Sequence, residues 1–177
     1  MSKAHSESSR PESSRSHRLT YQRERIPGGQ LTVIVDPDAD CVVYATFLQP
    51  RTHMAKRPDL LRKHTHPTVR AALLAYADGD LSPMDAVAVA QPGSDFRQRA
   101  WQAMREVPAG GVITYAELAR RIGNPGAARA AGTSCSTNQI PIFVPCHRIV
   151  GAQGLGGYAF GLSVKQQLLR HEGWLAH

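Results

Sequence analysis

Residues 145–149 read Pro-Cys-His-Arg-Ile, and this stretch decides more about the chain than any other. It places Cys146 beside His147, behind the apolar run 140–144 and ahead of a glycine-rich stretch. The nucleophile is the thiolate rather than the thiol, so a reactive cysteine needs a base or a positive charge nearby. An apolar wall with a basic, flexible rim suits a pocket for a flat, uncharged group. From these five residues alone, a buried structural cysteine is an equally good interpretation.

The chain has 177 residues, enough for one domain of ordinary size or two small ones. Its three cysteines, Cys41, Cys135 and Cys146, are widely spaced and form no Cys-x-x-Cys pair. This pattern argues against a disulfide scaffold or a zinc ribbon and favours a reducing compartment. No apolar run approaches the roughly 20 residues that span a bilayer, and no signal peptide is recognisable. We therefore expect no membrane partner and a cytoplasmic location, or a nuclear one if the source is eukaryotic.

Positive charge is concentrated in the C-terminal half. The net charge of the chain is +7, and residues 91–177 hold nine Lys/Arg against four Asp/Glu. A basic surface attracts polyanions, of which nucleic acid is the commonest. Ordinary solubility charge is the competing interpretation.

The N-terminal half predicts a tail followed by an α/β domain at 18–90. Residues 1–17 hold seven serines and almost no large apolar side chain, which predicts disorder, although a regulatory tail or a cloning remnant is also open. The β-rich runs 31–35 and 41–45 flank a turn-prone segment and predict strands. The spacing of apolar residues predicts a helix over 66–76.

The C-terminal domain, 91–177, predicts a series of helices. Apolar residues at helical spacing follow the possible cap Ser94. Thr114 and Glu117 have the Thr-x-x-Glu spacing of a capping box, which opens a second helix that ends at Gly123. Asn124 as cap and Pro125 at the first position predict a third helix through residues 126–131.

These last two helices form a helix-turn-helix signature. The second of them contains almost only small residues besides Arg129. A usual major-groove reader has several long polar side chains that reach base edges. The pattern therefore indicates DNA binding through shape and backbone, with tight helix packing as the alternative.

The chain resembles the O6-alkylguanine-DNA alkyltransferases, the methylated-DNA–protein-cysteine methyltransferases, over about residues 94–174. The matching residues are Phe96, Trp101, Ile113-Thr114-Tyr115, Gly123-Asn124-Pro125, Ala128-Arg129-Ala130, Asn138, Pro145-Cys146-His147-Arg148, Gly157-Tyr158, Lys165 and His171-Glu172-Gly173. The resemblance implies an α+β protein with a ribonuclease-H-like N-terminal α/β domain and a winged helix-turn-helix-like, mostly helical C-terminal domain. It implies DNA repair in which an alkyl group passes irreversibly from O6-alkylguanine, and less well from O4-alkylthymine, to the protein after nucleotide flipping.

The resemblance assigns the reaction chemistry to a small set of residues. Cys146 matches the alkyl acceptor, and His147 matches a histidine that acts through a bridging water. Glu172 matches the carboxylate that orients this histidine, and Asn138 the asparagine that supports the turn of the cysteine. On local grounds alone, Glu172 is a solvent-facing residue at a helix end and Asn138 a cap or turn residue.

The same resemblance assigns the contacts to DNA and to the target base. Tyr115 matches the tyrosine that assists nucleotide rotation and donates a proton toward guanine N3, although a half-buried tyrosine in a first helical turn is its local interpretation. Arg129, beside Ala128, matches the arginine that fills the space left by the flipped base. The remaining contacts come from the backbone carbonyls of Cys146 and Ile149 and from the alkyl-side wall of Tyr158, Ala159 and Phe160.

Two departures from the family pattern concern this wall. Many members carry a serine and glycines where this chain has Ala159 and Phe160, so the fit of bulky O6 adducts is left open. The glycine-rich loop before Tyr158 is also slightly short. The chain also lacks a cysteine and histidine set like the zinc site of some members, and His64 and His66 have no third ligand nearby. We therefore expect no metal and no cofactor. Cys135 is expected to be a packed residue.

Duplex DNA containing O6-alkylguanine is the expected partner of a monomer, and cooperative binding along DNA is left open. Three alternatives remain. A non-catalytic sensor of alkylated bases would lack the acceptor cysteine. A helix-turn-helix transcription regulator would need a more polar recognition helix. A Cys-His hydrolase would have its two residues far apart in the sequence.

Overall fold

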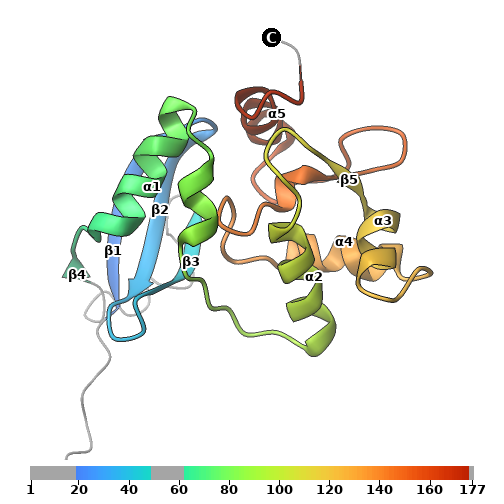
Figure 1. Ribbon diagram of the computed structural model, residues 1–177, viewed down its shortest axis with the longest axis horizontal. Coiled ribbons are helices and arrows are strands. Elements are labelled where there is room, and N and C mark those ends of the chain that lie inside the picture. Colours follow the sequence, from blue (N-terminus) through green and yellow to red (C-terminus); the bar gives the residue numbers. More distant parts are fainter. Residues whose placement is uncertain (1–18, 49–61, 176–177) are drawn as a thin grey trace, which may run out of the picture.

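The computed structural model describes residues 19–48 and 62–175, and the tail predicted at 1–17 lies outside them. A sheet with helix α1 lies on one side of the molecule, and most of the remaining helices lie on the other (Figure 1). This mixture of sheet and helices agrees with the predicted α+β class. Within the described residues, no helix is both long enough and apolar enough to cross a bilayer.

The N-terminal sheet has four strands in the order β3-β2-β1-β4. In chain order these are β1 (Thr20–Ile26), β2 (Gly29–Asp36), β3 (Cys41–Thr46) and β4 (Arg62–Lys63). The pairs β1–β2 and β2–β3 are antiparallel, and β4 lies parallel to β1. Gly28, with φ +93°, supplies the left-handed backbone of the first hairpin. The strands predicted at 31–35 and 41–45 are confirmed.

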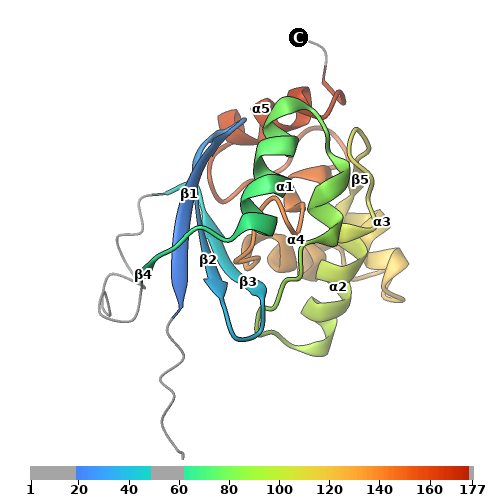
Figure 2. The same ribbon diagram turned by 60° about the vertical axis from the view of Figure 1, so that its left-hand side comes forward.

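Helix α1 (Pro67–Asp78) runs along one face of this sheet (Figure 2). It confirms the helix predicted at 66–76 and extends it by two residues. Pro67 occupies the first turn, where its missing N–H is no loss, and Gly79 ends the helix at φ +97°. Its buried face ends with Tyr76, which is 1% exposed.

The C-terminal half is built from short helices around a two-stranded parallel ladder. The helices are α2 (Asp95–Arg105), α3 (Tyr115–Arg121), α4 (Ala128–Ser136) and α5 (Leu162–His171), and the ladder joins β5 (Ile113–Thr114) to β6 (Ile149–Val150). The 3-10 helices are η2 (Ser82–Ala86), which connects the two halves, and η3 (Cys146–Arg148), directly before β6. Helix α2 confirms the helix predicted behind Ser94, although the Ser94 side chain makes no capping hydrogen bond.

The predicted helix-turn-helix is formed by α3 and α4, with one correction. Thr114 Oγ1 accepts the N–H of Glu117 at 3.1 Å, which is one half of the predicted capping box, whereas the Glu117 carboxylate pairs with Arg120 and Arg121. The start predicted for the next helix is wrong, because α4 begins at Ala128 rather than at Pro125. The side chain of Asn124 donates to the Ile122 carbonyl at the end of α3, so it does not cap α4. Residues 124–127 form a turn instead.

The two halves share one packed interior. Buried residues of the sheet, of α1 and of the C-terminal helices belong to one continuous apolar cluster. Backbone hydrogen bonds join Val42 to Ala88 and Ala90, and Ala45 to Gln139. This packing places the end of α5 against α1. The division predicted at residue 90 stays a prediction.

Candidate active site

Cys146 begins η3 and is almost fully buried, at 5% exposure. The segment before it contains Ile142 at φ +74°, a strained conformation for a β-branched residue. Asn138 holds this segment in place. Its Nδ2 donates to the Val144 carbonyl at 2.8 Å and to Cys146 Sγ at 3.2 Å, and its Oδ1 accepts the Ile140 N–H. The placement fits the supporting role that the resemblance assigns to Asn138.

The surroundings of Cys146 act on its thiol in opposite directions. Burial raises the pKa of Cys146, whereas the Asn138 hydrogen bond and the positive charge of Lys165 lower it. The net direction is upward, so the resting group is a thiol. Forming the thiolate therefore requires a base that takes the proton.

Lys165 on α5 is completely buried, at 0% exposure. Its Nζ donates to the carbonyls of Ile149 and Leu155, each at 2.6 Å, and to that of Gly157 at 3.3 Å. One ammonium group thus joins the strand after the cysteine to the glycine-rich loop 154–157. Burial lowers the pKa of Lys165, and the two nearby thiols, Cys146 and Cys135, act against this effect. The resemblance matched this residue but did not give it a role.

The carboxylate of Glu172, directly after α5, is buried rather than solvent-facing. Its Oε1 lies 2.8 Å from His147 Nε2. Burial alone would raise the pKa of Glu172, but the His147 ring and the Arg148 guanidinium outweigh it, so the pKa lies well below its ordinary range. An ionised carboxylate only accepts hydrogen bonds, so Nε2 carries a proton. Burial lowers the pKa of His147, which makes Nδ1 the free acceptor of a neutral ring.

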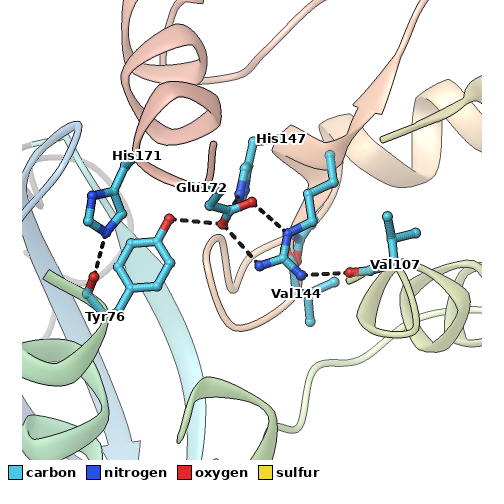
Figure 3. Close-up of polar contacts among 8 residues, drawn as sticks. Tyr76, Val107, Val144, His147, His171 and Glu172 are labelled. Carbon is cyan, nitrogen blue, oxygen red and sulfur yellow. Dashed lines mark hydrogen bonds and ion pairs between the residues drawn. The ribbon is translucent and has the colours of Figure 1, made fainter. Parts of the chain in front are cut away.

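Sequence reasoning missed two further donors to Glu172. Arg148 donates from Nε to Oε2 at 2.8 Å and from Nη2 to Oε1 at 2.9 Å. Tyr76 of α1 donates its hydroxyl to Oε1 at 2.9 Å (Figure 3). Arg148 also donates to the Val107 carbonyl. The signal for Arg148 was present, because a charge inside the apolar stretch 140–150 needs a buried partner.

A cavity of about 300 Å³ opens beside the thiol. Its lining residues are Tyr115, Gly132, Cys135, Ser136, Cys146, Gly157, Tyr158 and Ala159. The backbone of the loop 154–157 lies close to Tyr115, and only a glycine fits at position 156. A Cβ there would lie 2.7 Å from the Tyr115 hydroxyl. Burial raises the pKa of Tyr115, so its phenol stays protonated and able to donate. The cavity is large enough for a flat heterocycle.

The structure brings most of the residues from the resemblance to this cavity, but not all of them. Phe160 lies outside it and lines a neighbouring hollow, with its ring against Phe47 and Tyr158 at centroid distances of 5.6 and 5.5 Å. The Ile149 carbonyl already accepts from Lys165. Cys135, expected to be only a packed residue, lines the cavity, and burial raises the pKa of its thiol.

Arg129 and Ala128 lie at the start of α4, where Arg129 is exposed. Gly132, three residues further along the helix, lines the cavity, so Arg129 lies on the same face of α4. In the described part of the chain, no group of three or more His, Cys, Asp or Glu residues is arranged to hold a metal ion.

Known proteins match this chain in sequence and in structure. The family model described as the DNA-binding domain of 6-O-methylguanine DNA methyltransferase matches residues 95–174. The methylated-DNA–protein-cysteine methyltransferase of Salmonella typhimurium is 47% identical over 104 residues, which are 58% of this chain and 61% of that protein. That of Methanosarcina acetivorans is 48% identical over 102 residues, 57% and 65% of the two chains.

A solved structure extends the match to nearly the whole chain. The O6-methylguanine methyltransferase of Mycobacterium tuberculosis is 34% identical and superposes with a TM-score of 0.77, over 87% of this chain and 92% of that one. The chain belongs to the O6-methylguanine-DNA methyltransferase family. The OGT of the same organism in complex with DNA has a TM-score of 0.73 and 35% identity, over 86% of this chain and 92% of that one.

The methyltransferase family match confirms the resemblance drawn from the sequence. The matched segment 95–174 contains Cys146, His147 and Glu172. It excludes Tyr76, which no local motif marks. The sequence match spans about 61% of the length of the Salmonella relative, so the N-terminal half is compared through structure rather than through close sequence identity.

Proposed function

We propose that this protein accepts an alkyl group from O6-alkylguanine in duplex DNA on Cys146, once and irreversibly, as a methylated-DNA–protein-cysteine methyltransferase. The observation that carries the proposal is the setting of Cys146 Sγ. It faces a cavity the size of a base, receives a hydrogen bond from Asn138, and lies next to a His147–Glu172 pair. The matched relatives are named for this activity, and one of them is a complex with DNA.

The first step forms the nucleophile. His147 Nδ1 is buried and has no hydrogen-bond partner among the described residues, and the same holds for the hydroxyl of Tyr158. Two such unpartnered polar atoms support a bridging water beside Cys146, because a buried water needs two to four polar partners. The thiol proton passes through this water to Nδ1, while Glu172 stabilises the imidazolium that forms.

The second step transfers the alkyl group. Cys146 Sγ attacks the alkyl carbon bound to guanine O6, so that an S–C bond forms and the C–O bond breaks. The electron pair of the broken bond stays on the guanine. Tyr115 donates its phenolic proton toward guanine N3, and the proton taken from the thiol replaces it through solvent. The products are guanine and an S-alkylcysteine, and the stability of that thioether makes the reaction a single turnover.

DNA recognition precedes this chemistry. A base inside the duplex cannot present its O6 substituent to a buried thiol, so the nucleotide has to be flipped out. Arg129 on α4 then enters the duplex beside Ala128 and occupies the vacated space, since its planar group can both stack and hydrogen-bond. The exocyclic amine of guanine binds the backbone carbonyls of Cys146 and Ile149, and the Ile149 oxygen has a second lone pair beside the one that accepts from Lys165.

The walls of the cavity set which adducts fit. Tyr158 and Ala159 line the alkyl side. Because Phe160 packs outside this cavity, its bulk restricts large adducts less than its position in the sequence indicates. O4-alkylthymine, which is smaller and fills the cavity less well, is the poorer substrate.

Finer features of the assignment are part of the same proposal. The N-terminal half, 18–90, is a ribonuclease-H-like unit, and 91–177 is a winged helix-turn-helix-like unit that carries the reaction. The protein acts as a monomer in the cytoplasm, without metal or cofactor, and cooperative binding along DNA is open.

The test is incubation with a duplex that carries O6-methylguanine with a labelled methyl group. Cys146→Ala abolishes transfer while DNA binding persists, and Arg129→Ala binds DNA but transfers more slowly. Arg99→Ala, a change at an exposed residue of α2 away from the cavity, is the matched control and transfers normally. DNA binding without methyl transfer by the wild-type protein would instead support a sensor of damaged bases.

A further inference from the structure

Tyr76 connects the N-terminal half to the relay of the active site. It lies at the end of the buried face of α1, and its hydroxyl donates to Glu172 Oε1 across 96 positions of sequence. The ring points toward this carboxylate (Figure 3). Tyr76 lies outside the matched DNA-binding segment, whereas Glu172 lies within it.

The position of Tyr76 is fixed from two sides. His171 Nε2 donates a hydrogen bond to the Tyr76 backbone carbonyl. The centroids of the His171 and Tyr76 rings lie 5.0 Å apart. Glu172 follows His171 directly, so the end of α5 is held on α1 by adjacent residues. The phenol is therefore aimed at Glu172 by packing as well as by its own hydrogen bond.

We propose that Tyr76 is a positioning residue that sets the basicity of His147 through Glu172. The inference rests on the proposed function for its link to reaction rate. Tyr76 and His147 donate to the same oxygen, Oε1, at 2.9 and 2.8 Å. Two donors that share one oxygen each form a weaker hydrogen bond than either would form alone. The Tyr76 hydroxyl therefore reduces the stabilisation that Glu172 gives to a protonated His147.

Arg148 Nη2 is a third donor to Oε1, at 2.9 Å, and this contact stays in place when only Tyr76 is changed, so the effect of the Tyr76 hydroxyl adds to it. Glu172 and Lys165 face His147 from α5 and its end, Arg148 and Cys146 flank it in η3, and Tyr158, in the loop before α5, lies near Cys146 and Glu172. Of these groups, Glu172 is the anion while Cys146 is a thiol. Burial and the neighbouring carboxylate hold the pKa of Tyr76 well above its ordinary value, so it remains a donor throughout the working pH range. Because the Tyr76 hydroxyl stays protonated, it lowers the pKa of His147 by the same amount at every working pH and so favours the neutral ring.

The decisive variant is Tyr76→Phe, which removes the hydroxyl and keeps the ring. Without the competing donor, Glu172 favours the imidazolium more strongly, so the pKa of His147 rises. In a plot of the single-turnover methyl-transfer rate against pH, the acidic limb then moves to higher pH by about 0.5 to 1 unit. At a given pH on that limb, transfer becomes about threefold to tenfold slower. The plateau at higher pH stays unchanged. Tyr21→Phe, on β1 and far from the relay, is the control and keeps the wild-type profile.

Replacement of Tyr76 by 3-fluorotyrosine keeps the shape and makes the phenol a stronger donor, so the acidic limb moves the opposite way, to lower pH. This variant also decides the matter if Tyr76→Phe folds poorly. Profiles of both variants that superpose on the wild-type profile would overturn the role of Tyr76. A ¹⁵N NMR titration of the His147 ring measures the same pKa shift without any reaction. It therefore tests Tyr76 even if the wild-type protein accepts no methyl group, a result that would refute the proposed function alone.

Discussion

Arg148 binds both carboxylate oxygens of Glu172, through Nε to Oε2 at 2.8 Å and through Nη2 to Oε1 at 2.9 Å. Both side chains are buried, with 6% and 0% of their surfaces exposed. The pair is bidentate, the geometry in which Arg and a carboxylate interact most strongly. The pair joins the turn that carries Cys146 and His147 to the end of α5. The Arg148–Glu172 contact therefore stabilises the fold and also fixes the position of Glu172 relative to His147.

Removal of one partner of this pair is expected to be costly. Arg148→Met leaves the Glu172 charge buried with fewer donors, and we expect a loss of about 3–5 kcal/mol in the free energy of unfolding. Urea denaturation followed by circular dichroism measures it. The control is Arg70→Met, which breaks an exposed pair with Glu24 and should cost less than about 1 kcal/mol. Equal losses in the two variants would contradict the structural role of the Arg148 pair.

Stability is expected to fall in acid because of Glu172. The pKa of this group is lower in the folded protein than its ordinary value of 4.5, so the folded state binds fewer protons. Its stabilising effect is complete above about pH 4.5 and is lost as the pH falls below that value. The buried neutral His147, with its pKa below 6.5, acts in the same direction at somewhat higher pH.

Urea titrations at a series of pH values test this dependence. The slope of the unfolding free energy against pH below 4.5 is smaller for Glu172→Gln than for the wild-type protein. Glu106→Gln serves as the control at a carboxylate outside the relay. A wild-type slope in the Glu172 variant would show that another carboxylate governs the acid transition.

Asn138 is expected to act on the reactivity of Cys146 itself. Asn138→Ala removes the hydrogen bond to Sγ, so the pKa of the thiol rises and alkylation by iodoacetamide shifts to higher pH. Methyl transfer slows by about tenfold or more, since the lost donor also frees the Val144 carbonyl and loosens the turn. Gln91→Ala removes the contact to Asn138 Oδ1 and the acceptor of the Gln139 N–H but leaves the Sγ contact in place, so it is the matched comparison. A reactivity profile in Asn138→Ala like that of Gln91→Ala would rule out the Sγ contact as the cause.

Lys165 is expected to have two effects: its positive charge lowers the pKa of the Cys146 thiol, and its hydrogen bonds hold the loop 154–157 in place. Lys165→Met keeps the buried stem but removes the three carbonyl contacts and the positive charge. Both the pKa of the Cys146 thiol and the rate of amide hydrogen exchange in residues 154–157 should increase. Mass spectrometry reads the exchange and iodoacetamide titration reads the thiol. An unchanged loop with a shifted thiol would limit Lys165 to an electrostatic role.

Much of the fold could be predicted from the sequence, because its signals are local. The β-rich runs of β2 and β3 and the apolar spacing of α1 place those elements within one or two residues. The start of α4 could not be predicted in this way. An asparagine at position 124 can cap either the end of α3 or the start of the next helix, and the sequence does not distinguish the two. In the folded protein its amide closes the end of α3 instead.

The site was predictable where residues lie close in sequence or match the family pattern. Cys146 and His147 are adjacent, and Glu172 could be assigned by resemblance. Tyr76 could not be found, because its contact to Glu172 arises only when α1 packs against the end of α5. The direction of Phe160 also depends on tertiary packing, against Phe47 from the N-terminal half.

The central claim is that Cys146 is a one-use alkyl acceptor. The most direct measurement is peptide mass spectrometry after reaction with excess duplex DNA carrying trideuteromethylated O6-methylguanine. We expect one labelled methyl group per protein, located on Cys146, with none on Cys135 although it lines the same cavity. A label on Cys135, or continued demethylation beyond one equivalent of DNA, would contradict it.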